Sequence, residues 1–227
     1  MKISNDTVSI LKNFANINQG ILIKPGKSIR TISNHKNILA DAVVSEEFPV
    51  EVGIYDLNNF LSIISLYKDE LNLEFKGNDI VISGKAGRSK ISYRGCPSNM
   101  VTAPPEKGNP ELSNPEITFE LKQEDFDWIL QTASVLSSPQ IGVQSNGKKI
   151  SLISFDSSDD SSHVNSLEIA DGNGDSYKMI FKTENMKMIP DSYDVSISSK
   201  GFATFKSKSK PIQYWVTTEK GGEYKKK

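Results

Sequence analysis

The sequence has very few of the side chains that bind metals or form covalent cross-links. Its 227 residues include one cysteine, Cys96, and two histidines, His35 and His163. A single cysteine excludes a disulfide within the chain, and three residues of these types are too few for a structural zinc site. A reducing compartment, the cytoplasm, therefore fits this composition best.

Long apolar runs and a strong net charge are also missing. No run approaches the roughly 18 apolar residues of a membrane-spanning helix, and the first six residues include polar side chains where a secretory signal needs an apolar stretch. We therefore expect a soluble protein. Lys and Arg number 27 against 28 Asp and Glu, so the total charge does not indicate binding to nucleic acid or to a membrane surface. Any basic surface must be local.

Motifs of catalysis and cofactor binding are missing as well. His35 and His163 lie in polar segments typical of exposed loops. Residues 171–175 follow the first half of a calcium loop, but Ser176 replaces its glycine and Lys182 its final glutamate, which favours a polar hairpin turn. No glycine-rich phosphate loop with its lysine occurs. The sequence thus predicts no catalytic residue, no metal site and no cofactor.

What remains is a globular pattern of short strands and a few helices. Hydrophobic residues make up 37% of the chain and charged residues 24%, which is enough apolar side chain for a sizeable core. Apolar residues at helical spacing, with Ser4 or Asn5 and Asp56 as caps, predict helices at 4–17, 57–67, 123–136 and 183–188. Alternating segments between turn residues predict strands at 20–24, 28–32, 38–44, 50–55, 71–75, 79–83, 90–94, 117–121, 140–144, 149–155, 166–170, 177–181, 193–199, 202–205 and 212–217.

The prolines indicate where the chain divides. Five of the 10 prolines fall between residues 97 and 115, a density that no interior strand tolerates. Similar segments recur in the same order on both sides, since IYDLNNF at 54–60 aligns with IFKTENM at 180–186. We therefore predict two similar α+β domains, 1–95 and 117–227, joined by a linker at 96–116.

The outward faces of the predicted helices carry the residues that could contact a ligand. On the first two helices these faces carry small neutral polar groups with scattered lysines, and the fourth carries Lys182 and Lys187 around Glu184. Such a surface would hold nucleic-acid phosphates weakly and without reading bases, although polar outer faces are also ordinary for solvated helices. The third helix argues against a uniformly basic lining because Glu124, Asp125 and Asp127 cluster at its start.

Three segments resemble the sliding clamps of T-even-type bacteriophages. They are KNFANIN at 12–18, IYDLNNFL at 54–61 and ENMKM at 184–188, and their order and spacing agree with that family over essentially the whole chain. The resemblance implies the DNA clamp fold: a homotrimeric ring of two-domain subunits, with antiparallel sheets outside and two short helices per domain facing a central hole for double-stranded DNA.

The resemblance also implies partners and site residues. An ATP-dependent clamp loader would open the ring, a C-terminal peptide of the viral DNA polymerase would dock in an apolar pocket, and the clamp could assist late transcription in the host cell cytoplasm. Apolar candidates for that pocket are Val101, Ile212 and Trp215. The predicted DNA-facing residues are Lys12, Asn16, Asn58, Ser62, Lys68, Lys182 and Lys187, and the predicted subunit interface contains Ser89, Ile91, Tyr93, Val164 and Leu167.

Two other functions are compatible with parts of the sequence. A β-rich structural or adaptor protein that binds other proteins would share the strand content and the lack of catalytic motifs, but it would need no ring. A hydrolase would need a cleft with a titrating pair of groups, for which the sequence offers little. The basic end at 223–227 would either touch DNA or form a frayed tail, and we expect the tail.

Overall fold

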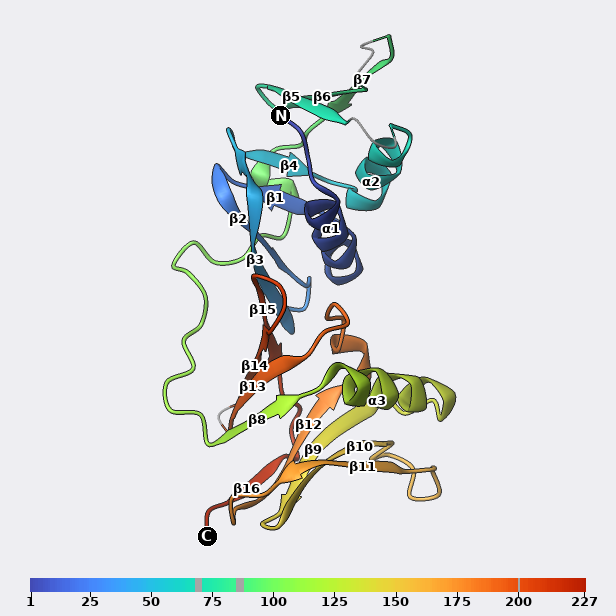
Figure 1. Cartoon of the computed structure of the whole chain (residues 1–227), viewed down its shortest axis with the longest axis vertical. Helices are drawn as coiled ribbons and strands as arrows, with labels where there is room; N and C mark the ends of the chain where they lie inside the picture. Colours follow the sequence, from blue (N-terminus) through green and yellow to red (C-terminus); the bar gives the residue numbers. More distant parts are fainter. Residues whose placement is uncertain (68–70, 85–87, 200) are drawn as a thin grey trace. The chain divides into compact units, whose positions relative to one another are not determined.

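The computed structural model describes residues 1–67, 71–84, 88–199 and 201–227, which form two compact units, Met1–Asn109 and Pro110–Lys227. Both units combine antiparallel sheets with helices, as the predicted α+β class requires (Figure 1). The predicted linker at 96–116 spans the boundary between the two units. The domain limits 1–95 and 117–227 stay predictions.

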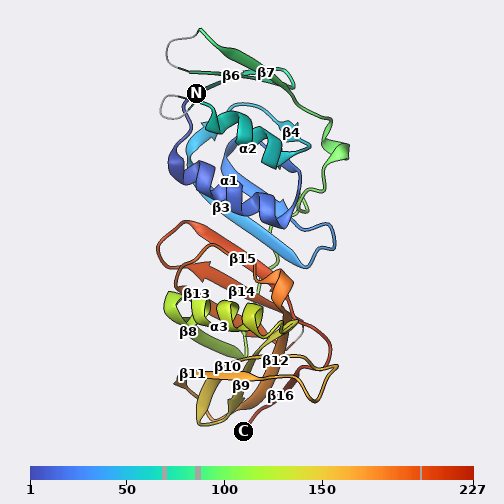
Figure 2. The ribbon, with the colours of Figure 1, turned by 90° about the vertical axis from the view of Figure 1, so that its right-hand side faces the viewer.

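The first unit contains two amphipathic helices that lie side by side (Figure 2). Helix α1 runs over Asn5–Ile17 with Ser4 as its N-cap, and α2 runs over Leu57–Ser65 with Asp56 as its N-cap. Each capping side chain accepts a hydrogen bond from a backbone N–H of the first turn, which satisfies a donor that has no partner inside the helix. The helices therefore begin where the sequence predicts.

The described residues of the first unit also form seven strands. Strand β1 (Ile21–Ile23) pairs with β4 (Val52–Ile54), and β2 (Gly26–Ile32) pairs with β3 (Ile38–Phe48), both antiparallel. A separate antiparallel sheet contains β5 (Asn72–Lys76), β6 (Asp79–Ser83) and β7 (Lys90–Arg94) in that order. A 3-10 turn, η1 (Ser98–Met100), follows them.

The start of the predicted linker is held against β4 by a contact between backbone atoms. Gly53 and Cys96 form an antiparallel bridge in which the Cys96 N–H donates to the Gly53 carbonyl at 2.8 Å. A Cβ atom on Gly53 would lie 2.5 Å from the Cys96 carbonyl oxygen and 2.9 Å from its Sγ. Only glycine leaves room for this approach.

Arg30 of β2 fixes the following part of the linker to the first unit. Its guanidinium donates to the Pro105 carbonyl at 3.1 Å and to Asn109 Oδ1 at 2.5 Å. The Asn109 amide in turn donates to Asp41 of β3, whose carboxylate lies 3.7 Å from the Arg30 Nε. These contacts explain why the chain up to Asn109 belongs to the first unit.

The second unit contains helix α3 (Gln123–Val135) and two antiparallel sheets. The five-stranded sheet has the order β11 (Asn165–Asp171), β10 (Lys149–Phe155), β9 (Gln140–Asn146), β12 (Ser176–Lys182) and β16 (Glu223–Lys225). The strands of the other sheet pair in the order β15 (Ile212–Thr217), β14 (Phe202–Ser207), β13 (Tyr193–Ser198) and β8 (Ile117–Leu121). Helix α3 packs against β9, β10 and β11.

An aromatic cluster around Tyr193 forms the centre of this unit. Its ring contacts Phe126, Phe205 and Tyr214 edge to face, with centroid distances of 5.9 to 6.3 Å. The buried hydroxyl of Tyr193 donates to the Ile189 carbonyl, and that of Tyr214 accepts from the Ile189 N–H at 3.2 Å. The polar ends of both rings are thereby satisfied inside the core.

Three local predictions are wrong. The helix predicted at 183–188 is a 3-10 turn, η2 (Thr183–Asn185). Six residues form too few hydrogen bonds to offset the cost of helix nucleation, and Met186 and Met188 are buried in the core. The turn at 171–175 connects no hairpin, since β10 and β9 lie between β11 and β12. The basic tail is not frayed, because Asp175 accepts from the Tyr224 hydroxyl at 2.8 Å and from the Lys227 N–H at 3.0 Å while β16 pairs with β12.

Glu46 of β3 holds the beginning of α1 against the sheet. Its carboxylate accepts from the Ser4 N–H and from the Thr7 hydroxyl, the latter at 2.5 Å. Partial burial raises the pKa of Glu46, but the hydrogen bonds from Thr7 and Ser4 outweigh it and lower the pKa from 4.5 to about 2. The charged form is therefore the one that stabilises the fold.

We expect Glu46→Gln to lower the free energy of unfolding at neutral pH by about 1–2 kcal/mol, because it removes charge-assisted hydrogen bonds. The pKa is lower in the folded state, so the contribution is complete above the ordinary value of 4.5 and disappears as the pH falls towards 2. Urea unfolding across this range should show the two proteins converging in acid. The neighbouring Glu47 is exposed, and Glu47→Gln should change little; a constant difference between wild type and Glu46→Gln at all pH values would contradict the assignment.

Candidate functional site

The outward face of α1 is polar and carries one cation. Lys12 and Asn16 are exposed, whereas Ile10, Leu11 and Phe14 are buried on the opposite side. Both predicted residues therefore lie on the open face of the helix. Lys12 also lines the rim of a hollow of about 360 Å³ between α1 and α2, where Leu61, Ile64 and Leu71 are among the lining residues; the others are Ile3, Ser4, Asn5, Val8 and Ser65.

The outward face of α2 is neutral. Asn58 and Ser62, two of the predicted DNA-facing residues, are exposed. The Ser62 hydroxyl donates to the Asn58 carbonyl at 2.8 Å, and the Ser65 hydroxyl donates to the Ser62 carbonyl at 2.7 Å. These two hydroxyls therefore donate to the backbone of their own helix, and the exposed face of α2 carries no charged side chain. Lys68, predicted on the same side, lies outside the described residues.

The outward face of α3 is acidic and partly apolar. Glu124 is exposed and lies 3.9 Å from the Lys122 ammonium, while burial and the charge of Glu124 raise the pKa of Asp125. Trp128 is 51% exposed and Val135 is 83% exposed. This helix does not supply a basic surface, in agreement with its sequence.

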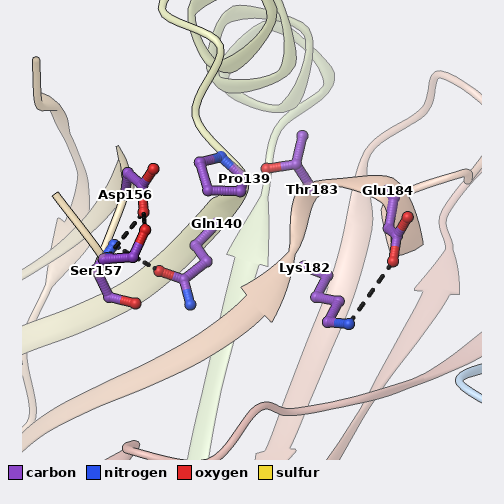
Figure 3. Close-up of a pocket in the computed structure, with 8 residues that line it drawn as sticks. Pro139, Gln140, Asp156, Ser157, Lys182, Thr183 and Glu184 are labelled. Carbon is purple, nitrogen blue, oxygen red and sulfur yellow. Dashed lines mark hydrogen bonds and ion pairs between the residues drawn. The ribbon is translucent and has the colours of Figure 1, made fainter. Parts of the chain in front are cut away.

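Lys182 and Lys187 flank the turn η2. Lys182 lies at the end of β12, and its ammonium is 3.8 Å from the Glu184 carboxylate (Figure 3). Its positive charge is therefore partly neutralised at the surface, where such pairs contribute little stability. Lys187 is exposed beyond the turn. A hollow of about 430 Å³ beside Lys182 is lined by Pro139, Gln140, Asp156, Ser157, Ser158, Lys182, Thr183 and Glu184.

The first group of predicted interface residues lies on β7, the last strand of its sheet, and just before it, since Ser89 precedes Lys90. The only strand partner of β7 in the described part of the chain is β6. The Tyr93 ring packs edge to face on Phe60 of α2 at 5.1 Å, and its hydroxyl donates to the Asp56 carbonyl at 3.3 Å. Ser89 is exposed and its hydroxyl lies 3.2 Å from that of Tyr67. Ile91 is half-buried beside them.

The second group lies at the start of β11, the last strand of the five-stranded sheet. Val164 is 63% exposed, and Leu167 is half-buried. Between them, the Asn165 amide donates to the Thr132 hydroxyl of α3 at 3.2 Å. Each predicted interface segment therefore occupies a sheet edge next to a helix.

Four exposed charged residues on these two strands are missing from the predicted site. They are Lys90 and Arg94 on β7 and Glu168 and Asp171 on β11. The signal was present in the sequence, because Lys90, Ser92 and Arg94 alternate with Ile91 and Tyr93 at the period of a strand. Alternation places all of the charge of β7 on one face.

The apolar candidates for a peptide pocket are core side chains. Val101, Ile212 and Trp215 are exposed by only 8%, 3% and 9%. The Trp215 indole donates to the Pro110 carbonyl at 2.9 Å. Their part in binding a peptide stays a prediction.

No cluster that could hold a metal ion occurs among the described residues. His35 and His163 are exposed, and burial raises the pKa of the Cys96 thiol. A raised pKa makes a thiol a poor nucleophile. No helix in the described ranges is long and apolar enough to span a membrane.

Comparison with known proteins decides the family. Residues 4–102 match the family described as DNA polymerase processivity factor, and residues 118–220 match the gp45 sliding clamp, C terminal. The sliding clamp of Vibrio phage KVP40 is 32% identical over 223 residues, which cover 96% of this chain and 99% of the relative. The chain belongs to the sliding-clamp family. The sliding clamp of Enterobacteria phage T4 is 34% identical over 205 residues, which cover 88% of this chain and 89% of the relative.

Solved structures show the same fold at low sequence identity. Proliferating cellular nuclear antigen from Entamoeba histolytica has a TM-score of 0.69 and 13% identity, with 94% of each chain covered. A structure of the C-terminal region of FEN-1 bound to A. fulgidus PCNA has a TM-score of 0.67 and 13% identity, with 95% of this chain and 96% of that chain covered. The predicted two-domain, antiparallel clamp fold and the resemblance to phage clamps are confirmed, while the three-copy ring stays a prediction.

This clamp is a processivity factor for a phage DNA polymerase, so its function is non-catalytic. The family match over both units favours this function over the β-rich adaptor and over the hydrolase. In a protein with this function, the hydrophobic core and the helix caps hold the helix faces and the sheet edges in defined positions.

Asp56 couples these elements, since its side chain caps α2 and its carbonyl accepts from Tyr93 of β7. We expect Asp56→Ala to lower the free energy of unfolding by about 1 kcal/mol, because the Asn59 N–H loses its capping partner. Asn58→Ala, on the exposed face of the same helix, should stay within about 0.5 kcal/mol of wild type. Thermal unfolding of the three proteins compares them, and equal losses would show that the cap contributes nothing specific.

Proposed function

We propose that this clamp closes into a ring of three copies around double-stranded DNA and tethers the viral polymerase to its template. The observation that carries the proposal is the match of both units to phage sliding clamps over nearly their whole length. Within this proposal, 1–95 and 117–227 are the two clamp domains and 96–116 is the linker between them.

The mechanism of such a ring is topological. A closed ring cannot leave DNA sideways, so weak contacts suffice and the lifetime of the tether is set by ring opening. The bound polymerase then stays near the primer at a high effective concentration. The neutral faces of α1 and α2, with Lys12 on the rim, suit a contact that slides along phosphates without reading bases.

Three partners follow in this proposal. A peptide from the C-terminus of the polymerase docks on an apolar surface, which is supported by the similar fold solved with the C-terminal region of FEN-1. An ATP-dependent clamp loader opens and closes the ring in the host cell cytoplasm. The loaded clamp also assists late viral transcription, as the family resemblance implies.

Closure of the ring is assigned to the two sheet edges. One copy presents β7 with Ser89, Ile91 and Tyr93, and the next presents β11 with Val164 and Leu167. Contacts between two different surfaces run head to tail and close into a ring when the rotation between copies allows it. Unpaired edge strands offer the N–H and C=O groups for such a contact.

The first test is the solution mass by light scattering across a dilution series. We expect a species at three times the 25.1 kDa chain mass that dissociates on dilution. A dimer at every concentration would contradict the three-copy ring, and a monomer at every concentration would contradict ring formation without a loader.

The second test concerns the interaction with DNA. We expect Lys12→Gln to weaken binding to two duplexes of unrelated sequence by the same factor. The slope of log affinity against log salt should also become shallower by about 0.9 for each phosphate that Lys12 neutralises in wild type. Fluorescence anisotropy measures both quantities. Lys206→Gln replaces an exposed lysine on β14 and should change neither; unequal effects on the two duplexes would argue for base reading instead.

A further inference from the structure

The edge at β7 is basic. Residues 88–94 contain Arg88, Lys90 and Arg94 and no acidic residue. All three side chains are exposed, and no carboxylate in the described part of the chain forms an ion pair with them. We call Arg88, Lys90 and Arg94 the basic edge.

The edge at β11 has the opposite charge. Residues 156–171, which contain the preceding loop and the strand, include five acidic residues and no lysine or arginine. The Lys149 ammonium lies 2.7 Å from Asp171, whereas Glu168 is exposed and contributes through its charge to the raised pKa of Lys149 without forming a direct ion pair within the described ranges. We call β11 with this loop the acidic edge; its acidic residues are Asp156, Asp159, Asp160, Glu168 and Asp171.

Both edges separate charge from apolar surface in the same way. On β7, Tyr93 faces α2 through Phe60, so Ile91 shares the helix side while Lys90 and Arg94 lie on the other face. On β11, the Asn165 side chain reaches Thr132 of α3, so Leu167 shares the helix side and Glu168 lies opposite. If two such sheets join with their helices on one side, apolar meets apolar and base meets acid.

Exposed apolar side chains lie on or next to the elements that form both edges. Val135 at the end of α3 and Val164 before β11 are exposed by 83% and 63%. Leu66, the C-cap of α2, is exposed by 69%. Large apolar residues with this much exposure favour a surface that a partner covers.

The length of the contact is limited by a bulge. The register between β10 and β11 shifts between Ile150 and Ser151, whose partners are Ala170 and Glu168, so Ile169 is left out of the ladder. A bulge bends the strand and interrupts regular pairing on its outer side. Continuous pairing with a second copy is therefore confined to Asn165–Glu168, which keeps Glu168 at the contact.

We infer that opposite charge selects the order in which copies join: the basic edge of one copy accepts only the acidic edge of the next. The inference rests on the proposed ring and adds what determines its direction and its response to salt. Two basic edges or two acidic edges repel each other, so symmetric dimers are disfavoured and head-to-tail closure remains. Because the paired charges lie on the exposed face, salt screens them and weakens closure.

Charge reversal tests the inference. Lys90→Glu and Glu168→Lys should each raise the protein concentration for half-assembly by about tenfold. A chain with both substitutions restores a base opposite an acid at every contact, and it should assemble closer to wild type than either single variant. Sedimentation velocity at about 50 mM and about 500 mM salt gives the mass distribution, and only wild type and the double variant should weaken with salt.

The exposed Lys206 of β14 provides the matched control, and Lys206→Glu should assemble like wild type. Thermal unfolding confirms that each variant is folded. Two outcomes would overturn the charge selection and leave the ring intact. In the first, the concentration for half-assembly does not change with charge reversal or with salt. In the second, the double variant assembles as weakly as the two single effects combined predict. Failure of wild type to assemble at low salt would instead overturn the ring itself.

Discussion

Strand edges have backbone N–H and C=O groups that a sheet cannot satisfy from within, and this requirement governs the organisation of both units. In the three-stranded sheet, the Leu73 N–H donates to the Met1 carbonyl at 2.8 Å, so the start of the chain covers the outer side of β5. In the five-stranded sheet, the short strand β16 covers β12. Within the described residues, β7 and β11 are the opposite ends of these two sheets and have no strand partner on their outer sides, and the proposed assembly depends on them.

Local features of the sequence predicted most of the fold. Ser4 and Asp56 were recognisable as caps because they precede apolar helical stripes, and most strands follow from alternation between turn residues. The proline-rich segment at 96–116 includes the point at which the two compact units divide, while the predicted domain limits stay predictions. The conformation of 183–188 could not be predicted from the local sequence, because the same apolar spacing is compatible with a helix and with a 3-10 turn followed by buried residues. The C-terminal strand depends on Asp175, about fifty residues away, and a polar tail gives no local sign of that contact.

The exposure of several candidate residues was predictable from the sequence, but the charges around them were not. Helical spacing placed Lys12, Asn58 and Ser62 on open faces, and the structure agrees. Spacing could not show that Glu184 lies beside Lys182, or that the hydroxyls of α2 bond to their own backbone. Nor could it show that β7 and β11 both end their sheets, since strand order is a property of the whole chain. The opposite charges of β7 and β11 can be recognised as charges of two sheet edges only when that strand order is known.

The bridge between Gly53 and Cys96 has a consequence for how this clamp can vary. Any side chain at position 53 would push Cys96 away, and β7 ends only two residues earlier at Arg94. The displacement would therefore tilt the strand that carries the basic edge without altering one of its side chains. In the proposed ring, the affinity between copies would then change through a buried backbone position that is itself no part of the contact, and a comparison of the contacting surfaces alone would not find the cause.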